Sequence, residues 1–216
     1  MVLILIAGYP ATGKTYLAQL IMSRYPDAFV DVDYDGIKEE YWDTFGFDTL
    51  AEKEALNARA LQEFYRRLET AMGAGRQILS DYPFSYKQRG TLESLASKYG
   101  YRILTIRMVG DLRSIFSRSR RRDLSQSRHL GHLVSRYHKG DVLQDRTQAD
   151  QLVDFETLAT RCEDRGYGSF SLGRTIEVNA TYVGSIDYMW LLDQIDACMK
   201  GDAKGTQGSV QKGEGQ

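Results

Sequence analysis

The sequence predicts an α/β protein in which helices cover both faces of a parallel sheet. Apolar runs that suit buried strands alternate with segments whose apolar residues recur at helical spacing. The first run, VLILIA at residues 2–7, has no polar alternation, as expected of a strand buried on both faces. A glycine-bounded loop joins this run directly to a helical segment. These observations favour one layered domain around a central sheet.

Each element is assigned from the period of its apolar residues and from the Gly, Pro or Asp that bounds it. The expected strands are residues 2–7, 28–32, 78–80, 102–109 and 175–178. The expected helices are residues 17–24, 50–72, 91–99, 111–122, 130–137, 152–162 and 188–199. The buried stripe of the last helix is predicted to contain Tyr188, Leu191, Leu192, Ile195 and Met199.

Composition and charge exclude several classes. The chain has 216 residues and is 42% hydrophobic, enough for one substantial core, which we place in a domain at residues 1–199. A formal net charge of −1 provides no overall attraction to nucleic acid or membranes. The two cysteines, Cys162 and Cys198, lack metal-ligand spacing and suit a reducing cytoplasm. Residues 200–216, rich in Gly, Gln and Lys, are predicted to be a disordered tail.

No membrane or secretory segment is expected. The apolar opening is too short to span a bilayer, and it lacks the basic start and the small-residue cleavage site of a secretory signal. We therefore predict a cytoplasmic protein.

The loop GYPATGKT, residues 8–15, matches the pattern G-x-x-x-x-G-K-[ST]. Such a loop presents backbone N–H groups and a helix N-terminus to phosphate. An ordinary glycine-rich turn is the alternative, but the strand before it and the helix after it favour a nucleotide-phosphate site. The residues expected to bind the nucleotide here are Gly8, Ala11, Thr12, Gly13, Lys14 and Thr15.

Two carboxylates are expected beside this loop, because ligands gather at the carboxyl ends of parallel strands. Asp81 ends the third strand and is predicted to hold Mg²⁺ together with the Thr15 hydroxyl. A helix-capping or turn role is the alternative for Asp81.

The stretch DVDYDGIK, residues 31–38, predicts a catalytic carboxylate that accepts a proton from an attacking hydroxyl. Asp35 is favoured over Asp33, because Lys38 follows Asp35 at a spacing of one helical turn and can orient an acceptor. Asp33 and Lys38 are expected to bind the substrate together with Asp81. The alternative is a set of carboxylates that decorate a turn and cap a helix.

A basic run, FSRSRRRDLSQSR, follows the fourth strand. Arg118 and Arg122 lie one helical turn apart and are predicted to reach over bound phosphates, since guanidinium groups bind phosphate oxygens bidentately. A solvated helix face or a patch for a nucleic-acid backbone are the alternatives. His129 and His132 are expected at the surface or in a substrate pocket rather than on a metal.

Taken in order, these motifs resemble the P-loop small kinases, the family of phage polynucleotide kinase and chloramphenicol phosphotransferase. The resemblance spans residues 1–199 and rests on five marks: GYPATGKT, the D-x-I-K of Asp35–Lys38, Asp81, the R-x-x-x-R of Arg118–Arg122, and TIEVNAT at residues 175–181. It implies a nucleoside-kinase-like P-loop NTPase fold with an arginine-rich lid at about residues 117–140. It also implies that Asp35 is the base and that Asn179 and Thr181 border the adenine.

The resemblance implies transfer of the γ-phosphoryl group of ATP, with Mg²⁺, to a hydroxyl of a small-molecule acceptor. A polynucleotide 5′-hydroxyl kinase and a non-catalytic nucleotide switch remain alternatives, whereas a GTPase is disfavoured because the chain contains no Asn-Lys-x-Asp stretch. Residues 129–173 exceed what a minimal kinase needs and are expected to help define the acceptor pocket. The sequence leaves the acceptor and the oligomeric state open.

Overall fold

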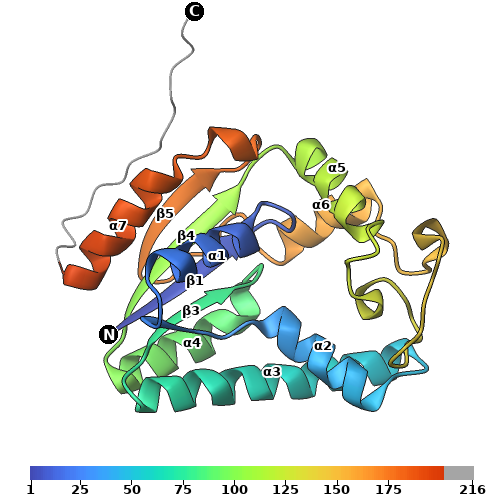
Figure 1. Cartoon of the computed structure of the whole chain (residues 1–216), viewed down its shortest axis with the longest axis horizontal. Coiled ribbons are helices and arrows are strands. Elements are labelled where there is room, and N and C mark those ends of the chain that lie inside the picture. Colours follow the sequence, from blue (N-terminus) through green and yellow to red (C-terminus); the bar gives the residue numbers. More distant parts are fainter. Residues whose placement is uncertain (202–216) are drawn as a thin grey trace, which may run out of the picture.

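In the computed structural model, which describes residues 1–201, five parallel strands form one sheet in the order β2-β3-β1-β4-β5 (Figure 1). The strands are β1 (Val2–Gly8), β2 (Phe29–Asp31), β3 (Gln77–Asp81), β4 (Arg102–Val109) and β5 (Arg174–Asn179). The predicted α/β class and all five expected strands are confirmed, with bounds that shift by at most one residue. The tail predicted after residue 199 lies almost wholly outside the described residues.

The helices are α1 (Lys14–Arg24), α2 (Tyr34–Phe45), α3 (Leu50–Gly73), α4 (Tyr86–Tyr99), α5 (Leu112–Asp123), α6 (Phe155–Asp164) and α7 (Tyr188–Lys200). Six of the seven expected helices are present, and α2 is a further helix that the apolar spacing did not predict. Three short 3₁₀ turns lie at Leu130–His132, Arg146–Gln148 and Val183–Ser185. Among the described residues, no helix is long and apolar enough to cross a membrane.

The core lies on both faces of the sheet. Strand β1 is buried along its whole length because it pairs with β3 on one side and β4 on the other. One face packs against α1 and α7, with Leu17, Leu191 and Ile195 fully enclosed. The opposite face packs against α2, α3 and α4 (Figure 1). In α7 the buried residues include Cys198, while Tyr188 and Met199 are only partly buried.

Helix starts are fixed by side chains that cap the free N–H groups of the first turn. Thr49 and Glu52 form a capping box at α3, and Ser85 and Gln88 form one at α4. Because of the second box, α4 begins at Tyr86, five residues before the start predicted from apolar spacing.

The helix predicted at residues 130–137 is wrong. A single 3₁₀ turn, Leu130–His132, is present, and Tyr137 instead forms an isolated antiparallel bridge with Phe47. The apolar side chains of this segment pack against Trp42 of α2, Phe47 in the loop between α2 and α3, and Leu56 of α3. Their spacing therefore reflects burial against two other helices rather than the period of a third one.

Candidate active site

The loop after β1 is held in an unusual backbone conformation. Gly8 has a φ of +108°, and a Cβ atom there would lie 2.0 Å from the carbonyl oxygen of Met108 on the adjacent strand. Only glycine allows this approach. Ala11 and Gly13 also have positive φ angles, 56° and 90°. Where right-handed and left-handed backbone conformations alternate, successive N–H groups point toward one place and form an anion-binding concavity.

Thr12 and Lys14 close the loop on itself. The Thr12 hydroxyl donates to the carbonyl oxygen of Tyr9 at 2.8 Å, and the Lys14 ammonium donates to the same oxygen at 2.7 Å. Burial lowers the pKa of Lys14 to about 8, partly offset by the charges of Asp81 and Asp35. Lys14 thus carries a poorly solvated charge at the centre of the loop, where a phosphate would stabilise it.

Thr15 and Asp81 meet at the carboxyl ends of β1 and β3. The Thr15 hydroxyl donates to Asp81 Oδ2 at 2.7 Å. Burial raises the pKa of Asp81, while Thr15 and Lys14 act in the opposite direction. A hydroxyl and a carboxylate are oxygen ligands of the kind that Mg²⁺ prefers. Residues 1–201 contain no group of three or more His, Cys, Asp or Glu side chains that could hold a metal ion. An ion held by Thr15 and Asp81 would take its other ligands from phosphate and water.

Asp33 caps the N-terminus of α2. Its carboxylate accepts from the backbone N–H of Asp35 at 2.9 Å. Gly36 leaves room for this cap, because a Cβ atom there would lie 2.7 Å from Asp33 Oδ2. Asp33 is solvent-accessible within the cavity described below, yet the enclosing protein and the charge of Asp35 raise its pKa to about 6. Asp33 therefore has a structural role that Asp35 does not share.

Asp35 projects from the first turn of α2 and pairs with Lys38 at 2.5 Å. Burial opposes the ionised form, but the charge of Lys38 outweighs it and holds the pKa of Asp35 well below its usual range. Arg128 acts in the same direction. His132 carries no positive charge near neutral pH, because burial lowers its pKa to about 4. Asp35 is therefore a carboxylate throughout the physiological range.

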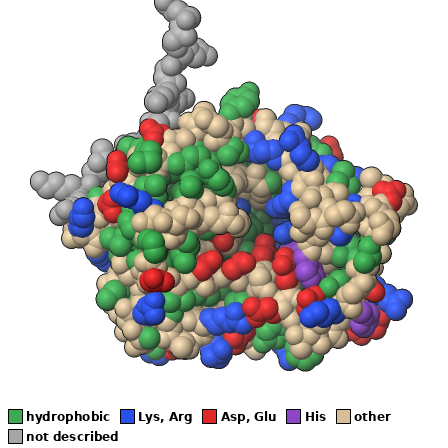
Figure 2. All heavy atoms as spheres, in the orientation of Figure 1, with side chains coloured by type: hydrophobic (Ala, Val, Ile, Leu, Met, Phe, Trp, Pro, Cys, Tyr) green, Lys and Arg blue, Asp and Glu red, His purple; other side chains and the backbone are tan. Residues whose placement is uncertain are grey.

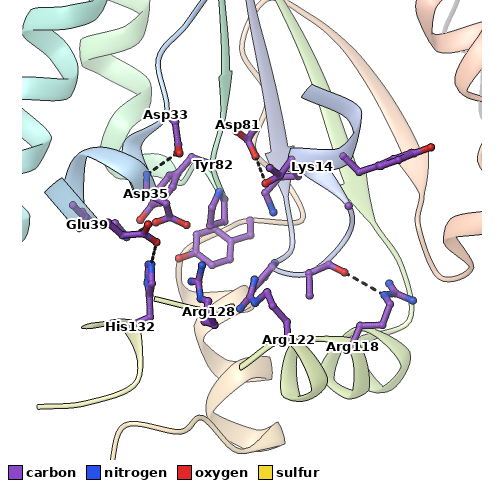
Figure 3. A pocket seen from close by; sticks show the side chains of 18 of the residues that line it. Lys14, Asp33, Asp35, Glu39, Asp81, Tyr82, Arg118, Arg122, Arg128 and His132 are labelled. Carbon is purple, nitrogen blue, oxygen red and sulfur yellow. Dashed lines mark hydrogen bonds and ion pairs between the residues drawn. The ribbon is translucent and has the colours of Figure 1, made fainter. Parts of the chain in front are cut away.

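One cavity of about 580 Å³ is lined both by the loop of residues 8–15 and by the Asp35–Lys38 pair (Figure 3). We call this loop the phosphate loop and this cavity the main cavity. Figure 3 shows Asp35, Glu39 and His132 on one side of it, Lys14 and Asp81 on another, and the arginines of α5 below. The predicted site residues that line it are Ala11, Gly13, Lys14, Thr15, Asp33, Asp35, Lys38, Asp81, Arg118 and Arg122. Gly8 and Thr12 lie behind its wall and shape the loop.

Arg118 and Arg122 lie on the same side of the cavity but have different partners. The guanidinium of Arg118 donates to the carbonyl oxygens of Ala11, Ala180 and Thr181 at 3.2, 2.6 and 2.7 Å. Arg118 thereby ties the phosphate loop to the loop after β5. Arg122 pairs with Asp123 at 2.8 Å.

Asn179 and Thr181 lie outside this cavity. They line a separate cavity of about 270 Å³ that is bordered by the loop after β5 and the start of α7. The Asn179 side chain accepts from the N–H of Thr181 at 2.9 Å, and the Thr181 hydroxyl accepts from the N–H of Asp111 at 2.8 Å. Arg118, which lines the main cavity, contacts Thr181 and so lies between the two cavities.

Several side chains of the main cavity were not singled out from the sequence. They are Glu39, Tyr82, Arg128, Arg161 and Tyr167. Glu39 follows Asp35 by four residues, and Tyr82 directly follows Asp81, so their spacing could have indicated them. His132, expected at the surface or in a substrate pocket, lines the cavity and pairs with Glu39 at 2.7 Å.

The surface view shows how charge is distributed over this face. In Figure 2, acidic side chains gather along the central hollow, and basic and histidine side chains border it. Asp33, Asp35, Glu39 and Asp81 supply the acidic lining, and Lys14, Lys38 and the arginines supply the basic lining. A site of this kind can bind phosphate, hold a divalent cation and orient a hydroxyl group in one place.

Comparisons with known proteins agree with this geometry. The model of a family described as AAA domain matches residues 3–137. No curated protein matches the chain significantly. A candidate kinase from Chloroflexus aurantiacus is similar in structure, with a TM-score of 0.69, 19% identity, and coverage of 93% of this chain and 96% of that one.

Two further structures are similar at lower scores. A shikimate kinase from Aquifex aeolicus has a TM-score of 0.51 at 14% identity and covers 95% of this chain and 100% of its own. The tunicamycin resistance protein of Deinococcus radiodurans has a TM-score of 0.51 at 13% identity, covering 93% and 96%. At these identities the likeness establishes the fold.

Proposed function

We propose that this chain, which belongs to the AAA domain family and has the fold of the P-loop small kinases that its sequence resembles, transfers the γ-phosphoryl group of ATP to a hydroxyl of a small molecule. The observation that carries the proposal is a single cavity lined both by the phosphate loop and by the Asp35–Lys38 pair. A nucleotide switch would need the loop but not the pair. Both are required for phosphoryl transfer to an acceptor.

The phosphate loop would hold the nucleotide. Its N–H groups and Lys14 would bind the β- and γ-phosphates, and the adenine would lie near Asn179 and Thr181 in the smaller cavity. Thr15 and Asp81 would hold Mg²⁺, which neutralises charge on the β- and γ-phosphate oxygens.

Asp35 would orient the acceptor hydroxyl and receive its proton. A carboxylate with a low pKa is a weak base, but the phosphoryl group passes through a loose transition state, so the proton need leave only late. Lys38 fixes the carboxylate, and its ammonium group lies over the rings of Tyr34 and Tyr82 at 5.1 and 5.3 Å. The positioned carboxylate then contributes through geometry as much as through basicity.

Arg122 and Arg128 would stabilise the charge that spreads over the transferring group. Arg128 Nε is buried and donates no hydrogen bond within residues 1–201, although Asp123 Oδ1 lies 3.9 Å away, so this N–H group beside the cavity can still donate to a bound anion. An unpaired buried donor is costly and gains when an anion binds. We place the reaction in the cytoplasm, which the buried, free thiols of Cys162 and Cys198 favour.

A polynucleotide acceptor is the second candidate. The basic run continues through Arg120 and Arg121, which do not line the cavity and could contact a strand backbone. The balanced net charge argues against it, and solved relatives named shikimate kinase and gluconokinase favour a small acceptor.

The test is transfer of labelled phosphate from ATP to a panel of sugars, hydroxy acids, nucleosides and antibiotics, beside 5′-hydroxyl oligonucleotides across a salt series. We expect labelling of a small molecule and weak, non-specific oligonucleotide binding. Efficient oligonucleotide labelling would establish the second candidate if its salt dependence were steep and became shallower in Arg120→Ala and Arg121→Ala. ATP binding without transfer to any acceptor would favour a switch.

A further inference from the structure

A second cavity adjoins the one that contains Asp35. It has a volume of about 510 Å³, within the range of small-molecule sites, and we call it the distal cavity. The two cavities share five lining residues: Lys38, Tyr82, His132, Arg161 and Tyr167. A molecule held by Asp35 at one end can therefore extend into the distal cavity at the other.

The lining of the distal cavity carries an excess of positive charge. Its basic residues are Lys38, Lys53, Lys87, Arg161 and Arg165, and its one acidic residue is Glu54. Lys38 pairs with Asp35. Within residues 1–201, the other four have no carboxylate within 4.0 Å. These four cations therefore have no ion-pair partner among the described residues. Lys87 and Arg161 are exposed to solvent, Arg165 is partly buried, and Glu54 lines the same cavity.

These cations converge from three helices. Lys53 comes from α3, Lys87 from α4, and Arg161 and Arg165 from the end of α6, four residues apart. A helix dipole favours cations at a C-terminus, as on α6, but disfavours Lys87 in the first turn of α4. Helix stability alone therefore does not account for the set.

Lys53 is the most enclosed of the four, with 9% of its surface exposed. Its ammonium group donates to the carbonyl oxygen of Val134 at 3.0 Å and lies 5.5 Å from the ring centre of Trp42. Burial, and then the nearby charge of Lys38, lower its pKa to about 8. The charges of Glu54 and Asp150 offset part of this shift, but neither carboxylate pairs with Lys53, and an anion bound in the distal cavity would offset more of the cost of burial.

From this arrangement we propose that the acceptor is a small hydroxyl compound that also carries an anionic group, a carboxylate or a phosphate. The inference rests on the proposed kinase function. The acceptor hydroxyl meets Asp35, and the anionic group lies in the distal cavity between Arg161, Arg165 and Lys87. The rings of Tyr34 and Tyr82, whose centres are 4.7 Å apart, form a wall against which the body of the molecule packs.

Binding of simple anions tests the distal cavity without any phosphoryl transfer. The protein is first saturated with ADP and Mg²⁺ so that the phosphate loop is filled, and is then melted in potassium phosphate, potassium acetate or potassium chloride at equal ionic strength. We expect phosphate or acetate to raise the melting temperature above the chloride value, and the effective anion identifies the group recognised.

The rise in melting temperature should be weakened in Arg161→Gln/Arg165→Gln. This double variant should need at least a tenfold higher anion concentration to reach the rise seen in the wild type. Partial recovery is expected in Arg161→Lys/Arg165→Lys. Arg89→Gln, a change of an exposed cation on α4 that lines neither cavity, is the control and should match the wild type. Equal behaviour of all proteins, or no rise with either anion, would overturn the proposal.

Kinetics with matched acceptors separate this inference from the proposed function. Glucose, gluconate and glucose 6-phosphate differ in carrying no anionic group, a carboxylate or a phosphate. In such sets, the anionic member should have at least a tenfold lower KM than the neutral one, and the double Gln variant should remove the difference. Arg165→Gln alone, a change at a residue that lines only the distal cavity, should reduce the difference while the KM for ATP stays unchanged. Transfer that ignores the anionic group would refute the inference and leave the kinase. Anion binding without transfer to any acceptor would refute the kinase and leave the site.

Discussion

The two sides of the active-site cavity are built in different ways. The nucleotide side comes from one short loop, residues 8–15, and from Asp81 on the adjacent strand β3. The acceptor side takes its residues from α2, from the irregular segment around His132, and from α6. The loop that would bind the phosphates is local in the sequence. The acceptor side, like the arginines of α5 and the residues proposed for the adenine, is assembled by tertiary packing.

This difference has a physical origin. Phosphate is bound by backbone N–H groups and a helix N-terminus, so its site requires a fixed local conformation that a short motif can encode. An acceptor is recognised by its own shape and charge, so its site needs side chains at many separate positions. We therefore expect changes on the two sides to affect different measurements.

The largest effect is expected from Asp35→Asn on the acceptor side. Loss of the carboxylate should lower phosphoryl transfer by on the order of 10²–10⁴, the usual contribution of a positioned base. Asparagine keeps the shape and an oxygen acceptor, so folding should be preserved. Transfer measured under saturating ATP checks this, and full activity would reduce Asp35 to a turn residue.

A smaller effect is expected from the pH dependence of stability at His132. Burial lowers its pKa to about 4, so its neutral form stabilises the protein above pH 6.5, and that contribution is lost as pH falls toward 4. Between pH 7 and pH 5 the wild type should lose about 2 kcal/mol relative to His132→Gln. Urea unfolding of both proteins at both pH values measures this difference. Asp31 and Asp33 also change the stability as they titrate, but both proteins contain them, so their effects cancel in the comparison. Parallel curves would contradict the burial of His132.

The smallest effect is expected from Asp81→Asn on the nucleotide side. The variant keeps an oxygen for Thr15 but loses the charge beside the metal, so half-maximal transfer should need roughly tenfold more Mg²⁺. Because burial raises the pKa of Asp81, its carboxylate is less favourable in the fold than in the unfolded chain, and the variant without ligands should melt no lower than the wild type. An unchanged Mg²⁺ requirement would remove Asp81 from the metal site.

The difference between the nucleotide side and the acceptor side also explains which site residues could be predicted from the sequence. The motif GYPATGKT, the strand before it and the helix after it are contiguous, so the phosphate-binding loop followed from local pattern alone. Arg161 and Tyr167 could not be assigned, because their place in the cavity depends on how α6 packs beside the phosphate loop, where Tyr9 contacts the cluster of Leu158 and Cys162.

The same limit applies to two elements of the fold. The spacing of Leu130, Leu133 and Tyr137 suits a helix, but these side chains are buried by contact with other parts of the chain, and the backbone between them is irregular. At α4 the start was missed because it depends on the cap formed by Ser85 and Gln88 rather than on apolar period. The spacing of apolar residues alone therefore fails to predict a helix, or its first residue, where tertiary contacts or caps decide the conformation.

The most direct test of the division between the two sides is a calorimetric titration of a non-hydrolysable ATP analogue, with Mg²⁺, into the wild type, Lys14→Ala and Asp35→Asn. Lys14 lies within the phosphate loop and Asp35 lies on α2 across the cavity, so the variants should separate. The account predicts a loss of affinity of about 10²-fold or more in Lys14→Ala, and affinity within about twofold of the wild type in Asp35→Asn. Undiminished binding by a folded Lys14→Ala protein, or an equal loss in both variants, would contradict it.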